Sequence, residues 1–291
     1  MIEKALASVE EWVACFGAQE LPVLRHTRRQ LEEAREHMDQ VSGKLIARIV
    51  LQDPLMAVRV LSYIQPLTGR RLHHDVATIA GAIMMLGVEP FFRRFENLPT
   101  IEDKLKDAPP HALLGTIQVI RRAQQAAHYA HTWAVWRVDV DVEEVTLAAL
   151  LHDLAEILLY VFAPKLALAI RDKQRADPSL RSVHVQEEVL GFSLRSIQIA
   201  LCQAWKLPAL LLSLIDDAHA DHPRIKNVIL AVSLARHLAH GWKDAALPDD
   251  LKSIAQLLNL TEAALGERLH LALPANEQTE MQQSQQNAQT H

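Results

Sequence analysis

The sequence has few of the residues that build disulfides, tight turns and phosphate-binding loops. Glycine occurs nine times and cysteine twice in 291 residues. Cys15 and Cys202 are too far apart to indicate a disulfide framework or a zinc site, so a reducing cytosol is expected. No Gly-rich phosphate loop or dinucleotide fingerprint occurs, and no Ser/His/Asp set can be assembled from spacing alone. These absences exclude the usual nucleotide-binding folds and the disulfide-rich secreted class.

Targeting signals are equally scarce. A secretory signal begins with basic residues followed by an apolar run. The first 17 residues instead contain Glu3, Glu10 and Glu11. No stretch reaches the roughly 18 consecutive apolar residues that span a bilayer. We therefore expect a cytoplasmic protein with no membrane partner.

No excess of positive charge is present. The net charge is −5 and the isoelectric point is about 6.3. Short basic pairs such as Arg93-Arg94 and Arg121-Arg122 are scattered along the chain, as on solvated helix faces. A nucleic-acid partner is therefore not expected.

What the chain does have is leucine and alanine at spacings of three and four, with 49% apolar residues overall. This periodicity predicts an all-α protein with enough apolar side chain for a large core. Asp53-Pro54 and Asp141 are typical helix starts, and Pro109-Pro110 precedes a long helix that we expect to reach Trp136. The next helix should carry His152 and end near Pro164.

The pattern also suggests a division of the chain into parts. We expect an N-terminal helix in residues 1–17, a main domain in 18–240, and closing helices in 241–273. The main domain should comprise an N-terminal helical layer, 18–98, and a bundle, 109–240. Residues 274–291 are polar, Gln-rich and without apolar period, which predicts a disordered tail.

Six blocks in a fixed order resemble the HDOD domain, the HD-related output domain of bacterial signalling proteins. They are "LPVL" from Leu21, "LQDPLMAVRVLSYI" from Leu51, "TIAGAIMMLGVEPF" from Thr78, "LAALLHDLAEILL" from Leu147, "EEVLGFSL" from Glu187 and "WKLPALLLSLIDDAH" from Trp205. The resemblance covers roughly residues 18–240. It implies an all-α fold related to the HD-type metal-dependent phosphohydrolases and the HD-GYP phosphodiesterases, in a branch that has usually lost catalysis.

The HD pair itself, His152-Asp153, is intact. If the protein is active, the resemblance implies that His152 and Asp153 are its catalytic residues. A divalent ion needs at least three or four protein groups to be held, and here the expected set is incomplete. Ala123 stands where the resemblance implies a histidine on the preceding helix, and Leu194 stands where a later polar ligand is common.

The remaining candidate metal ligands are His219, which matches a histidine common in the family, and Glu156. Glu156 takes the place where active HD enzymes often carry a lysine near the substrate phosphate, and a carboxylate there repels a phosphate. His152, Asp153, Glu156 and His219 could together supply four donors. Alternatively, His152-Asp153 is a buried pair that fixes helix register, for which His219 or an arginine on another helix could serve as partner.

Two functions follow from this partial set. We expect a non-catalytic signalling module that binds a protein partner or a small ligand, without a cofactor. Residues that could line its groove are His128, His131, Arg122 and Asp217. The alternative is a divergent metal-dependent phosphohydrolase acting on a nucleotide or cyclic dinucleotide.

Overall fold

The structure is a computed structural model, and it describes residues 1–68, 76–137, 139–177, 180–216 and 222–272. These residues form helices joined by short loops, and the one departure is an isolated bridge that pairs Val23 with Thr100. The prediction of an all-α protein is therefore confirmed. The predicted tail, 274–291, lies outside the described residues.

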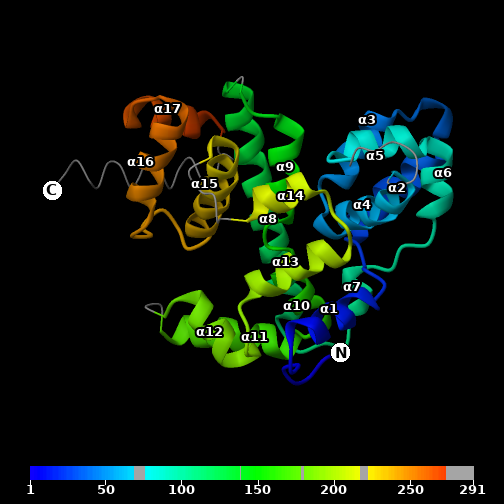
Figure 1. Cartoon of the computed structure of the whole chain (residues 1–291), viewed down its shortest axis with the longest axis horizontal. Coiled ribbons are helices and arrows are strands. Elements are labelled where there is room, and N and C mark those ends of the chain that lie inside the picture. Colours follow the sequence, from blue (N-terminus) through cyan, green and yellow to red (C-terminus); the bar gives the residue numbers. More distant parts are fainter. Residues whose placement is uncertain (69–75, 138, 178–179, 217–221, 273–291) are drawn as a thin grey trace.

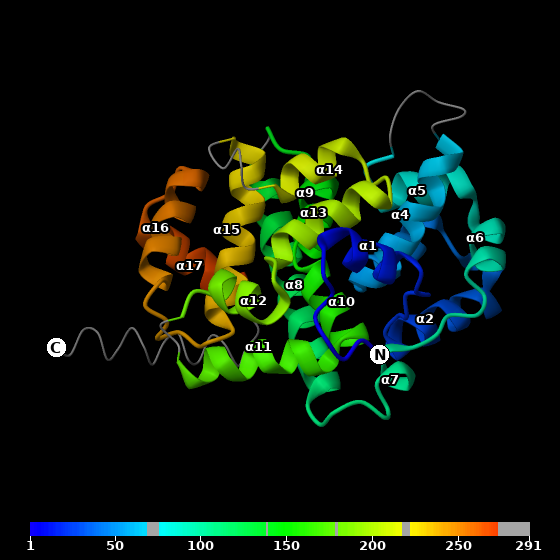
Figure 2. The ribbon, with the colours of Figure 1, turned by 60° about the horizontal axis from the view of Figure 1, so that its bottom comes forward.

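The helices group into an N-terminal layer and a central bundle (Figures 1 and 2). The layer consists of α2 (Arg25–Glu36), η1 (Met38–Gln40), α3 (Gly43–Val50), α4 (Pro54–Thr68), α5 (Ile79–Leu86) and α6 (Val88–Arg94), and α7 (Ile101–Lys104) follows it. The bundle consists of α8 (Ala112–Trp136), α9 (Val142–Leu151), α10 (Leu154–Phe162), α11 (Pro164–Ala176), α12 (Ser182–Leu190), α13 (Leu194–Ala204), α14 (Ala209–Ile215) and α15 (Pro223–Leu238). The bundle helices run from Ala112 to Leu238, and the division of the chain at 109 and 240 stays a prediction.

The two chain crossings between layer and bundle lie side by side. Val23 donates its backbone N–H to the carbonyl of Pro99 at 2.9 Å, and Ile101 donates to the carbonyl of Val23 at 2.8 Å. The "LPVL" segment that enters the layer is thus hydrogen-bonded to the segment that leaves it. The two peptide segments that connect the layer with the bundle therefore lie next to each other at Val23 and Thr100.

Asp53 fixes this entry segment to the layer. Its buried carboxylate accepts hydrogen bonds from the backbone N–H groups of Leu55 and Met56 at the start of α4, and from Leu24 at 2.7 Å. Burial raises the pKa of Asp53, although these backbone donors favour its ionised form. One carboxylate thus caps α4 and holds "LPVL" against it, which explains physically why "LP" and "DP" occur together.

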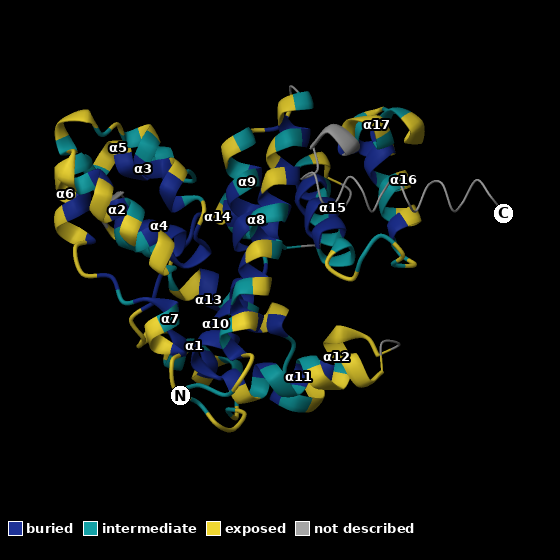
Figure 3. Ribbon diagram, turned by 180° about the vertical axis from the view of Figure 1, so that it is seen from behind, coloured by how far each residue is buried: buried dark blue, intermediate teal, exposed yellow. Residues whose placement is uncertain are grey.

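Helix α8 runs through the middle of the bundle and packs against α9, α10 and α15. Its inward face is built from small and aromatic side chains, including Ala123, Ala130 and Trp133, which are buried (Figure 3). The alanines allow neighbouring helices to approach closely. Ala123 is therefore part of the core.

The terminal helices attach to the bundle. Trp12 and Phe16 of α1 (Val9–Gly17) are fully buried, and the Phe16 ring lies 6.0 Å from that of Phe162. At the other end, α16 (Leu247–Leu258) packs on α15 and carries α17 (Glu262–Ala272). His237 of α15 contacts Asp250 of α16 at 2.5 Å.

The predicted continuous helix through His152 is wrong in one respect. Its hydrogen-bond pattern breaks at His152-Asp153, so α9 ends at Leu151 and α10 starts at Leu154. Taken together, Val142–Phe162 would be long and apolar enough to cross a membrane, with a hydropathy of 1.8, but 83% of its 18-residue apolar window is buried inside the protein. Such burial is what a core helix of a soluble protein shows.

Gly115 marks a close approach of α8 and α10. A methyl group at this position of α8 would lie 2.3 Å from Cε1 of Tyr160 on α10. We predict that Gly115→Ala lowers the free energy of unfolding by about 1–3 kcal/mol, because overpacking outweighs the gain in helix propensity. Chemical denaturation measures this, with Gly17→Ala as control, since the nearest atom there is 3.9 Å away. An equal effect of the two substitutions would contradict the close approach.

Candidate functional site

The site is built around the break between α9 and α10. In an unbroken helix the N–H of Ala155 would bond to the carbonyl of Leu151, four residues earlier. Instead, the buried side chain of Gln198 on α13 lies between them. Its Oε1 accepts from Ala155 N at 2.7 Å and its Nε2 donates to Leu151 O at 2.8 Å. Gln198 therefore satisfies both backbone groups and keeps α10 in line with α9.

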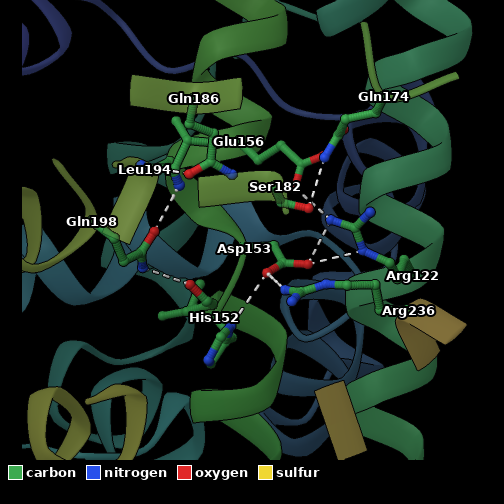
Figure 4. A network of polar contacts seen from close by, with 12 residues as sticks. Arg122, His152, Asp153, Glu156, Gln174, Ser182, Gln186, Leu194, Gln198 and Arg236 are labelled. Atoms are coloured by element: carbon green, nitrogen blue, oxygen red, sulfur yellow. Dashed lines mark hydrogen bonds and ion pairs between the residues drawn. The ribbon is translucent and has the colours of Figure 1, made fainter. Parts of the chain in front are cut away.

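Asp153 lies in the break and points toward α8 (Figure 4). Arg122 of α8 donates to Oδ2 of Asp153 from Nε at 2.9 Å and from Nη2 at 2.6 Å. The same Nη2 also donates to Oε2 of Glu156 at 2.6 Å. One guanidinium therefore bridges both carboxylates of the "HDLAE" segment.

The second oxygen of Asp153 is also occupied. Arg236 of α15 donates to Oδ1 from Nη2 at 3.1 Å, and Nδ1 of His152 lies 3.2 Å from the same atom. Because an ionised carboxylate can only accept, the imidazole Nδ1 is the donor. Asp153 thus connects α8, α15 and the end of α9.

The electrostatics follow from burial and neighbours. The side chain of Asp153 is only 8% exposed, and this burial alone would raise its pKa. Arg122, Arg236 and His152 outweigh burial and hold the pKa of Asp153 well below its ordinary value. Burial likewise disfavours the charge on Arg122, but Glu156 and Asp153 raise its pKa overall. Burial first, and then Glu156, raise the pKa of the Tyr160 hydroxyl to about 12.

Some of the residues predicted from the sequence lie together in the structure, although in an ion-pair network and not as the metal ligands or groove residues that were predicted. The structure brings together His152, Asp153, Glu156 and Arg122. The sequence suggested one arginine on another helix as a partner of the HD pair. The structure has two, Arg122 and Arg236, and Arg236 was not predicted. Gln198 was missed as well, because no local sequence signal marks a side chain that bonds to a distant helix.

Other predicted residues lie elsewhere. His128 and His131 are exposed on α8, and Nδ1 of His131 lies 3.4 Å from Oγ1 of Thr146. They are therefore not brought to the HD pair. Leu194 is buried at the start of α13, where its backbone N–H donates to Gln186. His219 and Asp217 lie outside the described residues.

A divalent metal does not fit this arrangement. Within the described part of the chain, no three His, Cys, Asp or Glu side chains are placed to hold a metal ion. Both oxygens of Asp153 and one oxygen of Glu156 are bonded to arginines. A metal ion between these carboxylates would occupy the place that the positive charge of Arg122 already takes.

Comparison with known proteins agrees with the six sequence blocks. The HDOD domain family matches residues 21–221. The chain belongs to the HDOD family. The match spans the N-terminal layer and most of the bundle, and the HDOD segment therefore includes Asp53, Arg122, Asp153 and Gln198. The search of curated proteins found no match to the chain.

Solved structures of other proteins have a fold similar to that of this chain, and two of them cover most of it. One is the MmoQ response regulator from Methylococcus capsulatus, with 16% identity and a TM-score of 0.65, covering 86% of this chain and 98% of that one. The other is a virulence factor from Campylobacter jejuni, with 18% identity and a TM-score of 0.64, covering 94% and 99%. At these identities the similarity concerns the fold alone.

Gln198 offers a test of the helix junction. We predict that Gln198→Ala lowers the free energy of unfolding by about 2–4 kcal/mol, because two buried backbone groups lose their partner. Gln203→Ala, an exposed position on the same helix, should change it by less than about 0.5 kcal/mol. Urea denaturation measures both values, and hydrogen exchange should show lost protection at Ala155. Unchanged exchange there would contradict the role of Gln198.

The lowered pKa of Asp153 predicts a pH dependence of stability. A carboxylate whose folded-state pKa lies below its unfolded value of 3.8 stabilises the fold above that pH, and this stability is lost as the pH falls below 3.8 toward the folded-state pKa. Asp153→Asn should therefore lower the free energy of unfolding by about 3–5 kcal/mol at neutral pH. The difference from wild type should shrink on acidification below pH 3.8.

Denaturation over a pH series measures this difference. Asp172→Asn is the matched control, since that carboxylate pairs with Arg171 on the surface and is 63% exposed. A gap between wild type and Asp153→Asn that stays constant through acid pH would show that Asp153 is not the ionised partner of the arginines.

Proposed function

We propose that this HDOD protein is a non-catalytic regulatory module of bacterial signalling, which works in the cytoplasm by binding a protein partner or a small ligand. Membership of the HDOD family supports the signalling role. The proposal needs no metal and no cofactor.

One observation carries the non-catalytic part of the proposal. Arg122 bonds to both Asp153 and Glu156, and Arg236 takes the other oxygen of Asp153. A metal-dependent hydrolase must present free carboxylate and imidazole donors, because its ion has to lower the pKa of a bound water. Carboxylates already neutralised by arginines are poor ligands for such an ion. The same contacts instead join α8, α10 and α15.

The regulatory part of the proposal follows from the architecture. The N-terminal layer and the bundle are connected at one place, where Val23 pairs with Thr100. Elsewhere between them, α4 packs on α9, and Gln124 of α8 donates to the carbonyl of Gln52 at 2.6 Å. A partner that binds both parts would therefore fix their relative position.

Metal analysis and a hydrolysis assay on the purified wild-type protein test the proposal together. After loading with manganese, iron and nickel and removal of free metal, we expect less than stoichiometric metal and no turnover of nucleotides or cyclic dinucleotides. The divergent phosphohydrolase is the opposite outcome: stoichiometric metal together with hydrolysis, both abolished by His152→Ala.

A further inference from the structure

Helix α5 of the N-terminal layer is apolar along its whole length, yet part of it is uncovered. Its eight residues, Ile79–Leu86, include no polar side chain. The helix packs against α3, α4 and α6, and three of its residues are buried there. Met84, in contrast, is 80% exposed, and Met85 is 39% exposed. A helix that is apolar all round is normally buried, so this exposed face indicates a surface that another molecule covers.

The surface beside this face carries positive charge. Helix α3 lies against α5, since a methyl group on Gly43 would be 3.4 Å from Cγ2 of Ile83. Directly after Gly43, α3 carries Lys44 and Arg48, which are both exposed. Their spacing of four residues places these two cations on one side of α3.

These cations are not neutralised by carboxylates nearby. Neither α3 nor α5 contains an acidic residue. Among the described residues, Lys44 and Arg48 form no ion pair. The next acidic residue after α5, Glu89, already pairs with Arg93 at 2.8 Å. The surface therefore combines exposed methionines with a surplus of positive charge.

We propose that α5 and α3 form a docking surface for an acidic amphipathic helix of a partner protein. Methionine side chains are unbranched and adapt to irregular apolar shapes, which suits them to the apolar stripe of a partner helix. Lys44 and Arg48 select a partner that carries carboxylates beside that stripe. The inference rests on the proposed function, since it names the chemistry of the protein partner that a non-catalytic module would bind.

Charge disfavours the other occupants of this surface. In a two-fold dimer the same patch of both copies meets itself, which would bring Lys44 and Arg48 of one copy toward those of the other. Like charges in such an interface repel each other. The net charge of −5 opposes binding to an anionic membrane. An acidic partner meets neither obstacle at this basic surface.

The experiment is a selection on the full-length protein from a displayed library of random peptides of about 16 residues, long enough for four helical turns. We expect enriched peptides to carry apolar residues three and four apart, with Asp or Glu between them. Their affinities are then measured by fluorescence anisotropy. Met84→Ser combined with Met85→Ser should weaken binding at least about tenfold, because buried anchors carry most of the binding energy. Lys44→Glu combined with Arg48→Glu should weaken it similarly, and added salt should weaken binding to wild type.

Matched variants outside the layer serve as controls. Leu114→Ser removes an apolar side chain of α8 that is 52% exposed, and should leave peptide binding unchanged. Arg121→Glu combined with Lys252→Glu makes the same change of charge at exposed positions of α8 and α16, and should also leave it unchanged. Circular dichroism should show the helical content of wild type in every variant, since each substituted side chain is exposed.

The outcomes separate this inference from the proposed function. No enrichment, enriched peptides without acidic residues, or peptides that bind the methionine variant as well as wild type would overturn the inference alone. So would a dimer, or binding to phosphatidylserine vesicles, that the methionine substitutions abolish. Peptide binding at least about tenfold tighter after removal of residues 274–291 would identify the tail of the chain as the occupant and overturn it too. Stoichiometric metal with hydrolysis would overturn the proposed function and, with it, the role of this surface in a non-catalytic module.

Discussion

The charge of Asp153 is the constraint on which the bundle depends. Asp153 is 8% exposed and stays ionised because cations lie against it, and Arg122 and Arg236 supply them from α8 and α15. Since Asp153 itself stands between α9 and α10, its ion pairs fix the relative position of four helix segments. Gln198 of α13 adds a fifth by bonding to the backbone on both sides of the break.

This arrangement changes the meaning of the HD pair. In a hydrolase the same two side chains would face a metal and a water molecule. Here His152 and Asp153 face each other and the arginines, and Glu156 completes the bridge to Arg122. The negative charge of Asp153 is neutralised by arginines of the same chain. The segment can therefore join the helices without a metal ion and without catalysis.

The sequence was sufficient for the fold and for part of the site. Periodic leucine and alanine predicted the helices, and the order of the "LP", "DP" and "HD" blocks predicted the family, because these blocks encode caps and buried faces that are local. Asp53 is an example, since its capping of α4 could be read from Asp53-Pro54 alone. Arg236 and Gln198 could not be found this way, because their partners lie 83 and 43 residues away along the chain and charge or amide chemistry alone does not identify them. The break at His152-Asp153 was missed for the same reason: the local pattern is helical, and a distant side chain makes the break tolerable.

The pairing of Val23 with Thr100 has a geometric consequence for motion. Both peptide connections between the N-terminal layer and the bundle run along one short line, on which Asp53 holds the entering segment. Translation of the layer would have to break the hydrogen bonds between Val23, Pro99 and Ile101, and rotation about that line would have to break the bond from Gln124 to the carbonyl of Gln52 and unpack α4 from α9. The layer is therefore held to the bundle at two places, and a partner bound across both parts would reinforce a connection that the chain already makes.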